Sequence, residues 1–194
     1  MPPNPPRHAP TVRAALRSAT DAIHQRMHEL EPFAAIANRT LTADRYPRLL
    51  QALLLFHSTI GPAADRHGWS ALSGAAERTE LLRGDLRRLG GGARPALVDW
   101  QPGSAHGMLG ALYAAEGSSM GGRVIGGQLD FLLGDAPGVR SFVIGTPGDA
   151  PRWRALLAAL EVHCMTAAAR HQAISGARSA FQLFERCVMG GLAD

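Results

Sequence analysis

Lysine is absent from this chain of 194 residues, so all 20 of its basic residues are arginines. The formal net charge is +4, and the arginines are scattered rather than gathered in one stripe. A basic chain can bind nucleic acid, a membrane surface, an anionic small ligand or an acidic redox protein. Without a basic stripe or an aromatic stacking platform we expect no nucleic-acid partner. The charge favours a ligand that bears carboxylates, or an acidic redox partner.

Cysteine and long apolar runs are also scarce. Cys164 and Cys187 are isolated thiols without a C-x-x-C spacing, which excludes a zinc ribbon and indicates a reduced, cytoplasmic setting. No apolar run approaches a membrane span, and the N-terminus lacks the apolar segment of a signal peptide. We therefore expect no membrane partner, a proline-rich disordered leader over residues 1–10, and one domain over residues 11–194.

The rest of the chain is dominated by apolar residues at helical spacing. Thr11 is the expected N-cap of a first helix, which Pro32 ends. The pattern predicts an all-α protein of about seven helices. Further helices are expected near residues 42–60 (to the Gly61–Pro62 break), 75–89, 109–133, 151–170 and 176–188. Residues 142–144 are the one short strand candidate.

Residues 109–128 form a helical apolar pattern interrupted by five glycines, at positions 117, 121, 122, 126 and 127. Each interior glycine destabilises a helix by roughly 0.5–1 kcal/mol relative to alanine. Gly117 and Gly121 share one helical face, where the bare backbone admits a close neighbour. The neighbour is either another helix or a flat ligand, and spacing alone leaves both open.

His24 lies at the border of the first helix's apolar stripe, seven residues after Arg17. Seven residues are about 20° short of two turns, which puts both side chains on one face roughly 10 Å apart. That distance suits a ligand with a central metal and an anionic rim. A histidine at a core boundary is the structural alternative. His28 follows at i+4, but no third ligand completes a metal site.

Two motifs resemble one known family. The run from Tyr113 to Ile125, YAAEGSSMGGRVI, is similar to the distal helix of bacterial heme oxygenases. Upstream, the run from Leu16 to His24, LRSATDAIH, resembles the proximal helix of that family. The resemblance implies an all-α heme oxygenase-like domain that holds heme between a proximal helix and a glycine-kinked distal helix.

The resemblance also implies the heme contacts. His24 would ligate the iron as a neutral imidazole, its second nitrogen held by a partner such as Glu29 or a backbone carbonyl. Arg17 and Arg154 would pair with the heme propionates, since arginine donates two parallel hydrogen bonds to a carboxylate. Phe181 would pack near the heme, or simply in the core. The family also assigns heme contacts to Tyr113 and Gly122.

On the distal side, the resemblance gives catalytic roles to Gly117, Ser118 and Gly121. The glycines would bring the backbone close to the macrocycle, and Ser118 with backbone groups near Gly117 would hold the water that delivers protons. Mammalian members have an aspartate in place of Ser118. The anchoring of that water therefore differs here.

The implied reaction is the oxidative opening of heme to biliverdin, carbon monoxide and ferrous iron, with heme as cofactor and substrate and O2 as co-substrate. The glycine run does not open a strand–turn–helix unit of the kind that binds a flavin or nicotinamide cofactor. Electrons must therefore come from a ferredoxin or a flavin reductase. A phytochrome is a candidate recipient of biliverdin. Two alternatives are a heme-binding or heme-sensing protein without turnover, and the related helical fold of thiamine-degrading enzymes, which needs a nucleophilic cysteine.

Overall fold

The computed structural model describes residues 10–91, 98–134 and 139–190, except for the side chains of residues 119–124. Within these residues the secondary structure is entirely helical, which confirms the all-α prediction. Residues 1–9 lie outside the described part, so the disordered leader and the extent of the domain stay predictions.

Ten helical segments make up the described part of the chain. In chain order they are α1 (Val12–Glu29), α2 (Glu31–Ala37), α3 (Tyr46–Arg66), the 3-10 turn η1 (Ser70–Leu72), α4 (Ala75–Arg88), α5 (Ala105–Gln128), α6 (Asp130–Leu133), α7 (Ser141–Ile144), α8 (Asp149–His163) and α9 (Ala167–Gly190).

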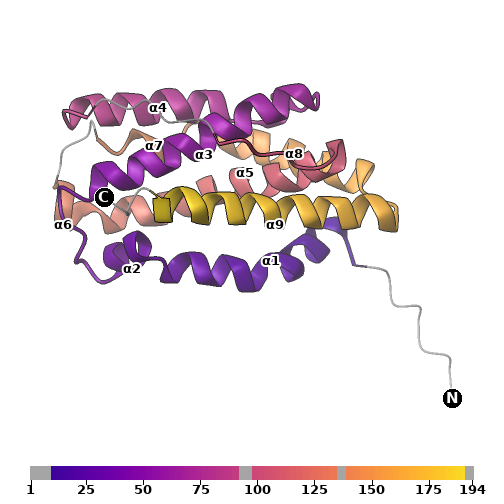
Figure 1. Cartoon of the computed structure of the whole chain (residues 1–194), viewed down its shortest axis with the longest axis horizontal. Coiled ribbons are helices and arrows are strands. Elements are labelled where there is room, and N and C mark those ends of the chain that lie inside the picture. Colours follow the sequence, from indigo (N-terminus) through magenta and orange to yellow (C-terminus); the bar gives the residue numbers. More distant parts are fainter. Residues whose placement is uncertain (1–9, 92–97, 135–138, 191–194) are drawn as a thin grey trace, which may run out of the picture.

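Helix α9 is the central element of the bundle (Figure 1). It packs most extensively against α5, and it also contacts α1 on one side and α3 on the other. Helix α4 lies beyond α3, and α8 packs on α5. Helix α1 lies mainly against α9, with smaller contacts to α2 and α8. The proximal and distal helices predicted from the sequence are thus α1 and α5, and both rest on α9.

Side-chain caps explain where two of these helices begin. Thr11 caps α1 as predicted, because its Oγ1 accepts a hydrogen bond from Ala14 N at 3.1 Å. Ser104 caps α5 in the same way, accepting from Gly107 N at 3.0 Å. The distal helix therefore begins at Ala105, before the predicted start at Leu109.

Two predicted breaks are wrong. The first helix ends at Glu29, and Pro32 lies in the first turn of α2, where a proline is tolerated. Helix α3 continues through Gly61 and Pro62 to Arg66. Its last turns contain Ala63 and Ala64, which are fully buried in the core. Their burial compensates for the hydrogen bond that Pro62 does not donate.

The strand candidate and the last helix boundaries are also corrected. Residues 142–144 belong to the short helix α7, at whose start Phe142 N donates to the carboxylate of Asp85 at 3.1 Å. Helix α8 begins at Asp149 and ends at His163, before the predicted end near residue 170. Helix α9 begins at Ala167, so Gly176 lies in its interior rather than at its start.

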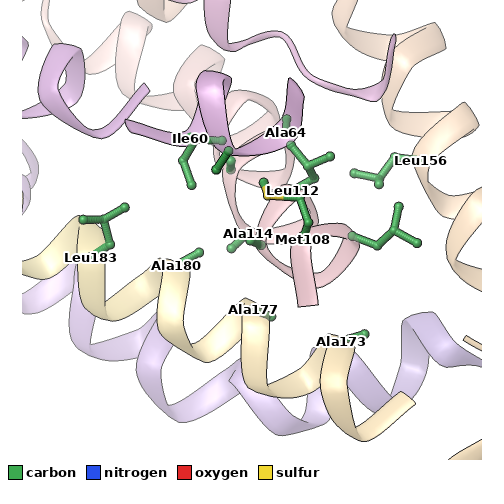
Figure 2. Close-up of a cluster of buried hydrophobic side chains, with 14 of the residues drawn as sticks. Ile60, Ala64, Met108, Leu112, Ala114, Leu156, Ala173, Ala177, Ala180 and Leu183 are labelled. Carbon is green, nitrogen blue, oxygen red and sulfur yellow. The ribbon is translucent and has the colours of Figure 1, made fainter. Parts of the chain in front are cut away.

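Small residues bring the backbones of α5 and α9 into contact. A Cβ on Gly110 would overlap the carbonyl of Ala173, and a Cβ on Gly176 would overlap the carbonyl of Gly107. The α9 face that meets α5 continues with small, fully buried residues at 173, 177 and 180 (Figure 2). The distance between helix axes depends on the side chains at the contact, so these residues allow an unusually close crossing.

Because the helices cross closely, alanine substitution should change the free energy of unfolding strongly at Gly110 and only slightly at Gly127. Gly110→Ala should destabilise the protein by about 1–3 kcal/mol or more, since the new methyl group meets backbone that cannot move aside. Gly127→Ala is the matched control on the same helix, because nothing lies within 4 Å of its Cβ position. It should stabilise by roughly 0.5–1 kcal/mol. Chemical denaturation measures both, and equal effects would contradict the close crossing.

Candidate functional site

The predicted axial histidine, His24, lies on α1 between two ring neighbours. The ring centroid of His28, one turn along α1, is 4.9 Å away, and that of Phe181 on α9 is 6.1 Å away. Both rings meet His24 nearly edge-on, with interplanar angles of 82° and 81°. The side chain is exposed, with one aromatic neighbour on its own helix and one on α9.

The environment of His24 favours the neutral imidazole. Partial burial lowers its pKa, the neighbouring His28 lowers it further, and Asp21 opposes the two. A neutral imidazole is the form that ligates a metal. Within the described residues no hydrogen bond joins this ring to Glu29 or to a backbone carbonyl, so the predicted partner of the second nitrogen is not seen.

Arg17 of α1 is near enough to Tyr113 of α5 for its charge to act on the pKa of the phenol. Arg13 and Arg17 both act to lower the pKa of Tyr113, against the larger raising effect of its burial. Both arginines are exposed, and neither forms an ion pair among the described residues. Two available guanidinium groups beside a phenol fit the carboxylates of an anionic ligand.

A cavity of about 70 Å³ lies on the inner side of Ser118. Apolar side chains of α2, α3, α5, α7 and α9 line it, among them Phe33, Phe142 and Phe184. Its polar side chains are Ser118 and Tyr46. The hydroxyl of Tyr46 donates to Val139 O at 2.8 Å, and the hydroxyl of Ser118 donates to Ala115 O at 2.7 Å.

Helix α9 connects this cavity with His24. Phe181 contacts His24, and Phe184, three residues later, lines the cavity together with Ser118. Residues three apart in a helix lie on one face. His24 and Ser118 are thus adjacent to neighbouring parts of the same aromatic surface, as a ligand site between α1 and α5 requires. An apolar cavity, a free imidazole and an arginine-lined edge fit heme in chemical character.

The remaining predicted residues are less closely tied to this site. Arg154 is exposed on α8 and forms no ion pair among the described residues. The Cβ position of Gly117 faces the ring of Trp153 at 3.5 Å, so at this glycine the close neighbour is a side chain of α8. Gly121 and Gly122 fall within α5 but outside the described side chains, and their roles stay predictions.

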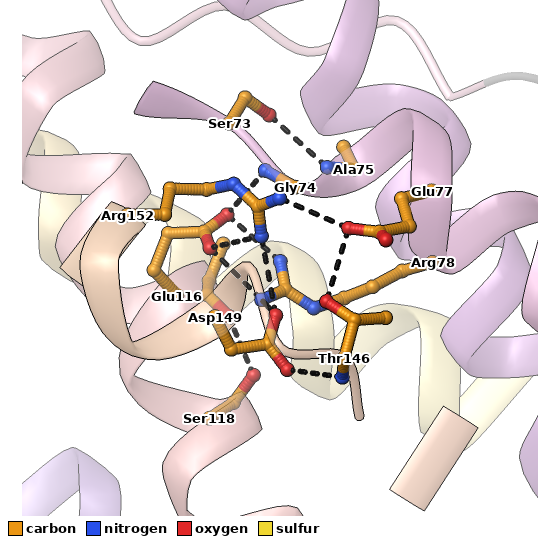
Figure 3. Close-up of polar contacts among 11 residues, drawn as sticks. Ser73, Gly74, Ala75, Glu77, Arg78, Glu116, Ser118, Thr146, Asp149 and Arg152 are labelled. Carbon is orange, nitrogen blue, oxygen red and sulfur yellow. Dashed lines mark hydrogen bonds and ion pairs between the residues drawn. The ribbon is translucent and has the colours of Figure 1, made fainter. Parts of the chain in front are cut away.

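A buried polar network adjoins the distal residues (Figure 3). Glu116, which precedes Gly117, accepts two hydrogen bonds from Arg78 of α4 at 2.8 and 2.9 Å. Its Oε1 also accepts from Gly74 N at 2.9 Å. Arg78 in turn donates to Asp149 of α8 at 3.0 Å, and Arg152 contacts Asp149 at 3.1 Å. Three helices therefore meet at one arginine.

Sequence reasoning missed this network. The glutamate stands inside the distal motif, but the motif alone does not reveal that its carboxylate is 1% exposed. Arg78 is one of 20 arginines, and its neighbours in sequence give it no distinguishing pattern. The signal that was available is Glu116 itself, a charged residue in an otherwise apolar stretch, which requires a buried partner.

A larger surface hollow of about 610 Å³ lies between the end of α5 and the residues around α7. It contains no histidine, and the arginine that lines it, Arg140, donates to Asp130 at 2.5 Å and to the carbonyl of Gly134. We therefore assign the site to the His24 side. In the described residues, no group of three or more histidine, cysteine or carboxylate side chains could hold a free metal ion.

Neither cysteine suits a nucleophile. Both thiols are buried, and burial raises the pKa of Cys164 and raises that of Cys187 to about 11. The thiolate is the reactive form, so both thiols are inert at neutral pH. The thiamine-degrading alternative, which needs a reactive cysteine, has no support here.

Comparison with known proteins identifies the family, although no family model matches the chain. A protein named heme oxygenase from Xanthomonas campestris pv. campestris (strain 8004) is 39% identical over 114 residues. The match covers 57% of this chain and 67% of that protein. The chain belongs to the heme oxygenase family. The resemblance inferred from the two motifs is confirmed.

A solved structure supports the same fold. The crystal structure of NO- and CO-bound heme oxygenase from Neisseria meningitidis superposes with a TM-score of 0.73 at 23% identity. The similarity covers 94% of this chain and 92% of that one. The heme oxygenase-like fold class is thereby confirmed. In the part of this heme oxygenase that the structure describes, no helix has the length and apolarity to cross a bilayer.

One further histidine lies in the core, in an unusual environment. His57 of α3 is 1% exposed, between the rings of Phe56 and Phe142, with centroids 5.1 and 5.4 Å away. Neither ring nitrogen has a hydrogen-bond partner among the described residues. Burial and the nearby Arg78 lower its pKa well below the ordinary value, so His57 stays neutral in the folded enzyme.

Because His57 is buried and neutral, we expect the stability of the fold to decrease at acidic pH. Its pKa is lower in the folded than in the unfolded chain, so below about pH 6.5 only the unfolded chain takes up this proton. The free energy of unfolding should fall on acidification, with His57 contributing up to about 1.4 kcal/mol per pH unit. His57→Leu should reduce this slope in urea denaturation between pH 6.5 and 5, with pH 8 as the baseline. An unchanged slope would contradict the assignment.

Proposed function

We propose that this heme oxygenase binds heme between α1 and α5 and opens it to biliverdin, carbon monoxide and ferrous iron. The observation that supports this most directly is the arrangement of His24, Phe181 and Ser118. The free imidazole contacts Phe181, and Phe184 on the same face of α9 lines the apolar cavity beside Ser118. When bound, heme would supply both the iron that activates dioxygen and the macrocycle that is oxidised.

His24 is the residue that would ligate the heme iron. Its environment keeps the imidazole neutral, and His28 and Phe181 limit the rotation of the ring. A ligand whose ring orientation is fixed beforehand binds a metal with a smaller loss of conformational entropy. Phe181 and the apolar lining of the cavity would exclude water from one edge of the macrocycle.

The arginine-lined edge would hold the propionates. Arg17 is the proposed partner, with Tyr113 and Arg13 beside it. Arg154 is proposed as a second partner, because it is exposed and has no ion pair of its own among the described residues. Arginine suits this role because its planar fork matches a carboxylate.

On the distal side, Ser118 is proposed to hold the water that delivers protons. Its hydroxyl hydrogen is donated to Ala115 O, so its oxygen lone pairs remain to accept a hydrogen bond from that water. Close approach of the heme to the backbone at Gly121 and Gly122 is the proposed reason for these two glycines, whereas Gly117 makes room for Trp153 and is proposed to act through its backbone groups beside Ser118. In this arrangement no side chain acts as a general base.

Electrons would come from a separate donor, such as a ferredoxin or a flavin reductase, with O2 as co-substrate. The net positive charge of +4 suits an acidic donor. The two cysteines are reduced and buried, which agrees with the proposed cytoplasmic location. A bacterial phytochrome that takes up biliverdin is the proposed recipient of the product, by analogy within the family.

Turnover of the hemin complex tests this proposal. With ascorbate or a ferredoxin–reductase pair under air, and catalase to remove free peroxide, the Soret band should decay. A broad biliverdin absorbance should appear in the red, and carbon monoxide should be released. The same mixture without protein is the control for unspecific bleaching. Return to ferric heme without biliverdin or carbon monoxide would contradict turnover and leave the heme-binding alternative.

A further inference from the structure

Glu116 connects the distal part of α5 to two other elements. Arg78 binds its carboxylate through both terminal nitrogens, at 2.8 and 2.9 Å, and Gly74 N adds a third hydrogen bond at 2.9 Å. Arg152 of α8 approaches Oε2 to 3.8 Å (Figure 3). A bidentate arginine–carboxylate pair fixes direction as well as distance, because both N–H bonds must stay aligned.

Burial makes this connection rigid. The side chains of Arg78 and Glu116 are 4% and 1% exposed, so water cannot replace a lost hydrogen bond. Nη2 of Arg78, which donates to Glu116, also donates to Asp149 at 3.0 Å, and the second oxygen of Asp149 accepts from Thr146 N at 2.9 Å. Moving Glu116 would leave the buried guanidinium of Arg78 with Asp149 as its remaining carboxylate partner and would break two buried hydrogen bonds, which is unfavourable.

The absence of a side chain at Gly74 makes room for the arginines of this network. A Cβ on Gly74 would lie 2.6 Å from Nη1 of Arg78 and would also collide with Arg152. Both guanidinium groups therefore occupy the space that a side chain would fill. The start of α4 is built around the two arginines that face Glu116.

The position of Glu116 in the sequence ties the network to the site. Gly117 and Ser118 follow directly, and each helical residue adds 1.5 Å of rise and about 100° of rotation. Fixing the carboxylate of Glu116 therefore fixes the height and rotation of α5 at these two residues. The ring of Trp153, next to Arg152 on α8, lies 3.5 Å from the position that a Cβ on Gly117 would take, and it packs against the ring of Tyr113, which adds a second contact to the same part of α5.

We propose that Glu116 is a positioning residue of the distal site. Through Arg78 it sets the orientation of Ser118 relative to the heme. The inference rests on the proposed heme site between α1 and α5, and it adds a residue that would not touch the heme. Displacements near 1 Å at a reacting centre have large effects on rate, so an anchor outside the site has a functional consequence.

Glu116→Gln tests this, because it keeps the size of the side chain and removes the charge. The probe is carbon monoxide bound to the ferrous heme complex, whose infrared C–O stretching band reports on the distal surroundings. We expect the band to shift and the dissociation rate of carbon monoxide to change about tenfold or more. Heme binding itself should persist. Leu160→Ala is the control, a fully buried core residue on α8 that lowers the melting temperature without altering Arg78.

The outcomes are distinct. A shifted band in Glu116→Gln and an unshifted band in a Leu160→Ala protein of similar melting temperature would support positioning. A melting temperature that falls in Glu116→Gln with an unchanged band would overturn it, leaving the proposed function intact. If Glu116→Gln does not fold, Arg78→Lys keeps the charge but loses the bidentate fork and should shift the band. If the wild-type protein binds no heme, the proposed function itself fails.

Discussion

The backbone contact between α5 and α9 sets the distance between two of the helices that carry residues of the proposed site. Gly110 meets Ala173 and Gly107 meets Gly176 without intervening side chains, so the two helices cross at close range. Helix α5 contributes Tyr113, Gly117 and Ser118 to the site, while α9 contributes Phe181 and Phe184. A wider crossing would move the aromatic residues away from the distal residues and would open the core around them.

Apolar and polar contacts determine different aspects of the position of α5. The apolar crossing with α9 fixes the distance between the helices, but a stripe of small residues resists sliding only weakly, since alanine and glycine offer little to interlock. The ion pair of Glu116 with Arg78 adds direction, because both oxygens and both nitrogens are paired. Buried ion pairs contribute little net stability once desolvation is counted. Their value in this enzyme is a defined orientation of the turn that contains Ser118.

The sequence was most informative where the relevant residues are contiguous. His24 and the glycine-rich run belong to local motifs, and the family followed from them. The helical class and the Thr11 cap followed from apolar residues at helical spacing, which is also a local pattern. Contacts between distant residues could not be read in this way. Arg78 and Asp149 meet Glu116 only in the folded chain, and Trp153 covers Gly117 from another helix.

Local propensity also failed where tertiary contacts override it. The β-branched residues of 142–144 favour a strand, yet the buried carboxylate of Asp85 accepts the N–H of Phe142 and residues 141–144 form a helical turn. Pro62 suggests a helix end, yet the burial of Ala63 and Ala64 keeps α3 intact. In both cases the deciding partner lies far away in the sequence or in the core.

The proposed function depends most directly on heme being held through His24 on the α1 side of this bundle. Electron paramagnetic resonance of the ferric heme complex tests it, with His24→Ala and His28→Ala as a matched pair of neighbouring histidines. We expect that His24→Ala loses the axial-nitrogen signal, that added imidazole restores it, and that His28→Ala keeps it. Loss of the signal in His28→Ala with retention in His24→Ala would contradict the account.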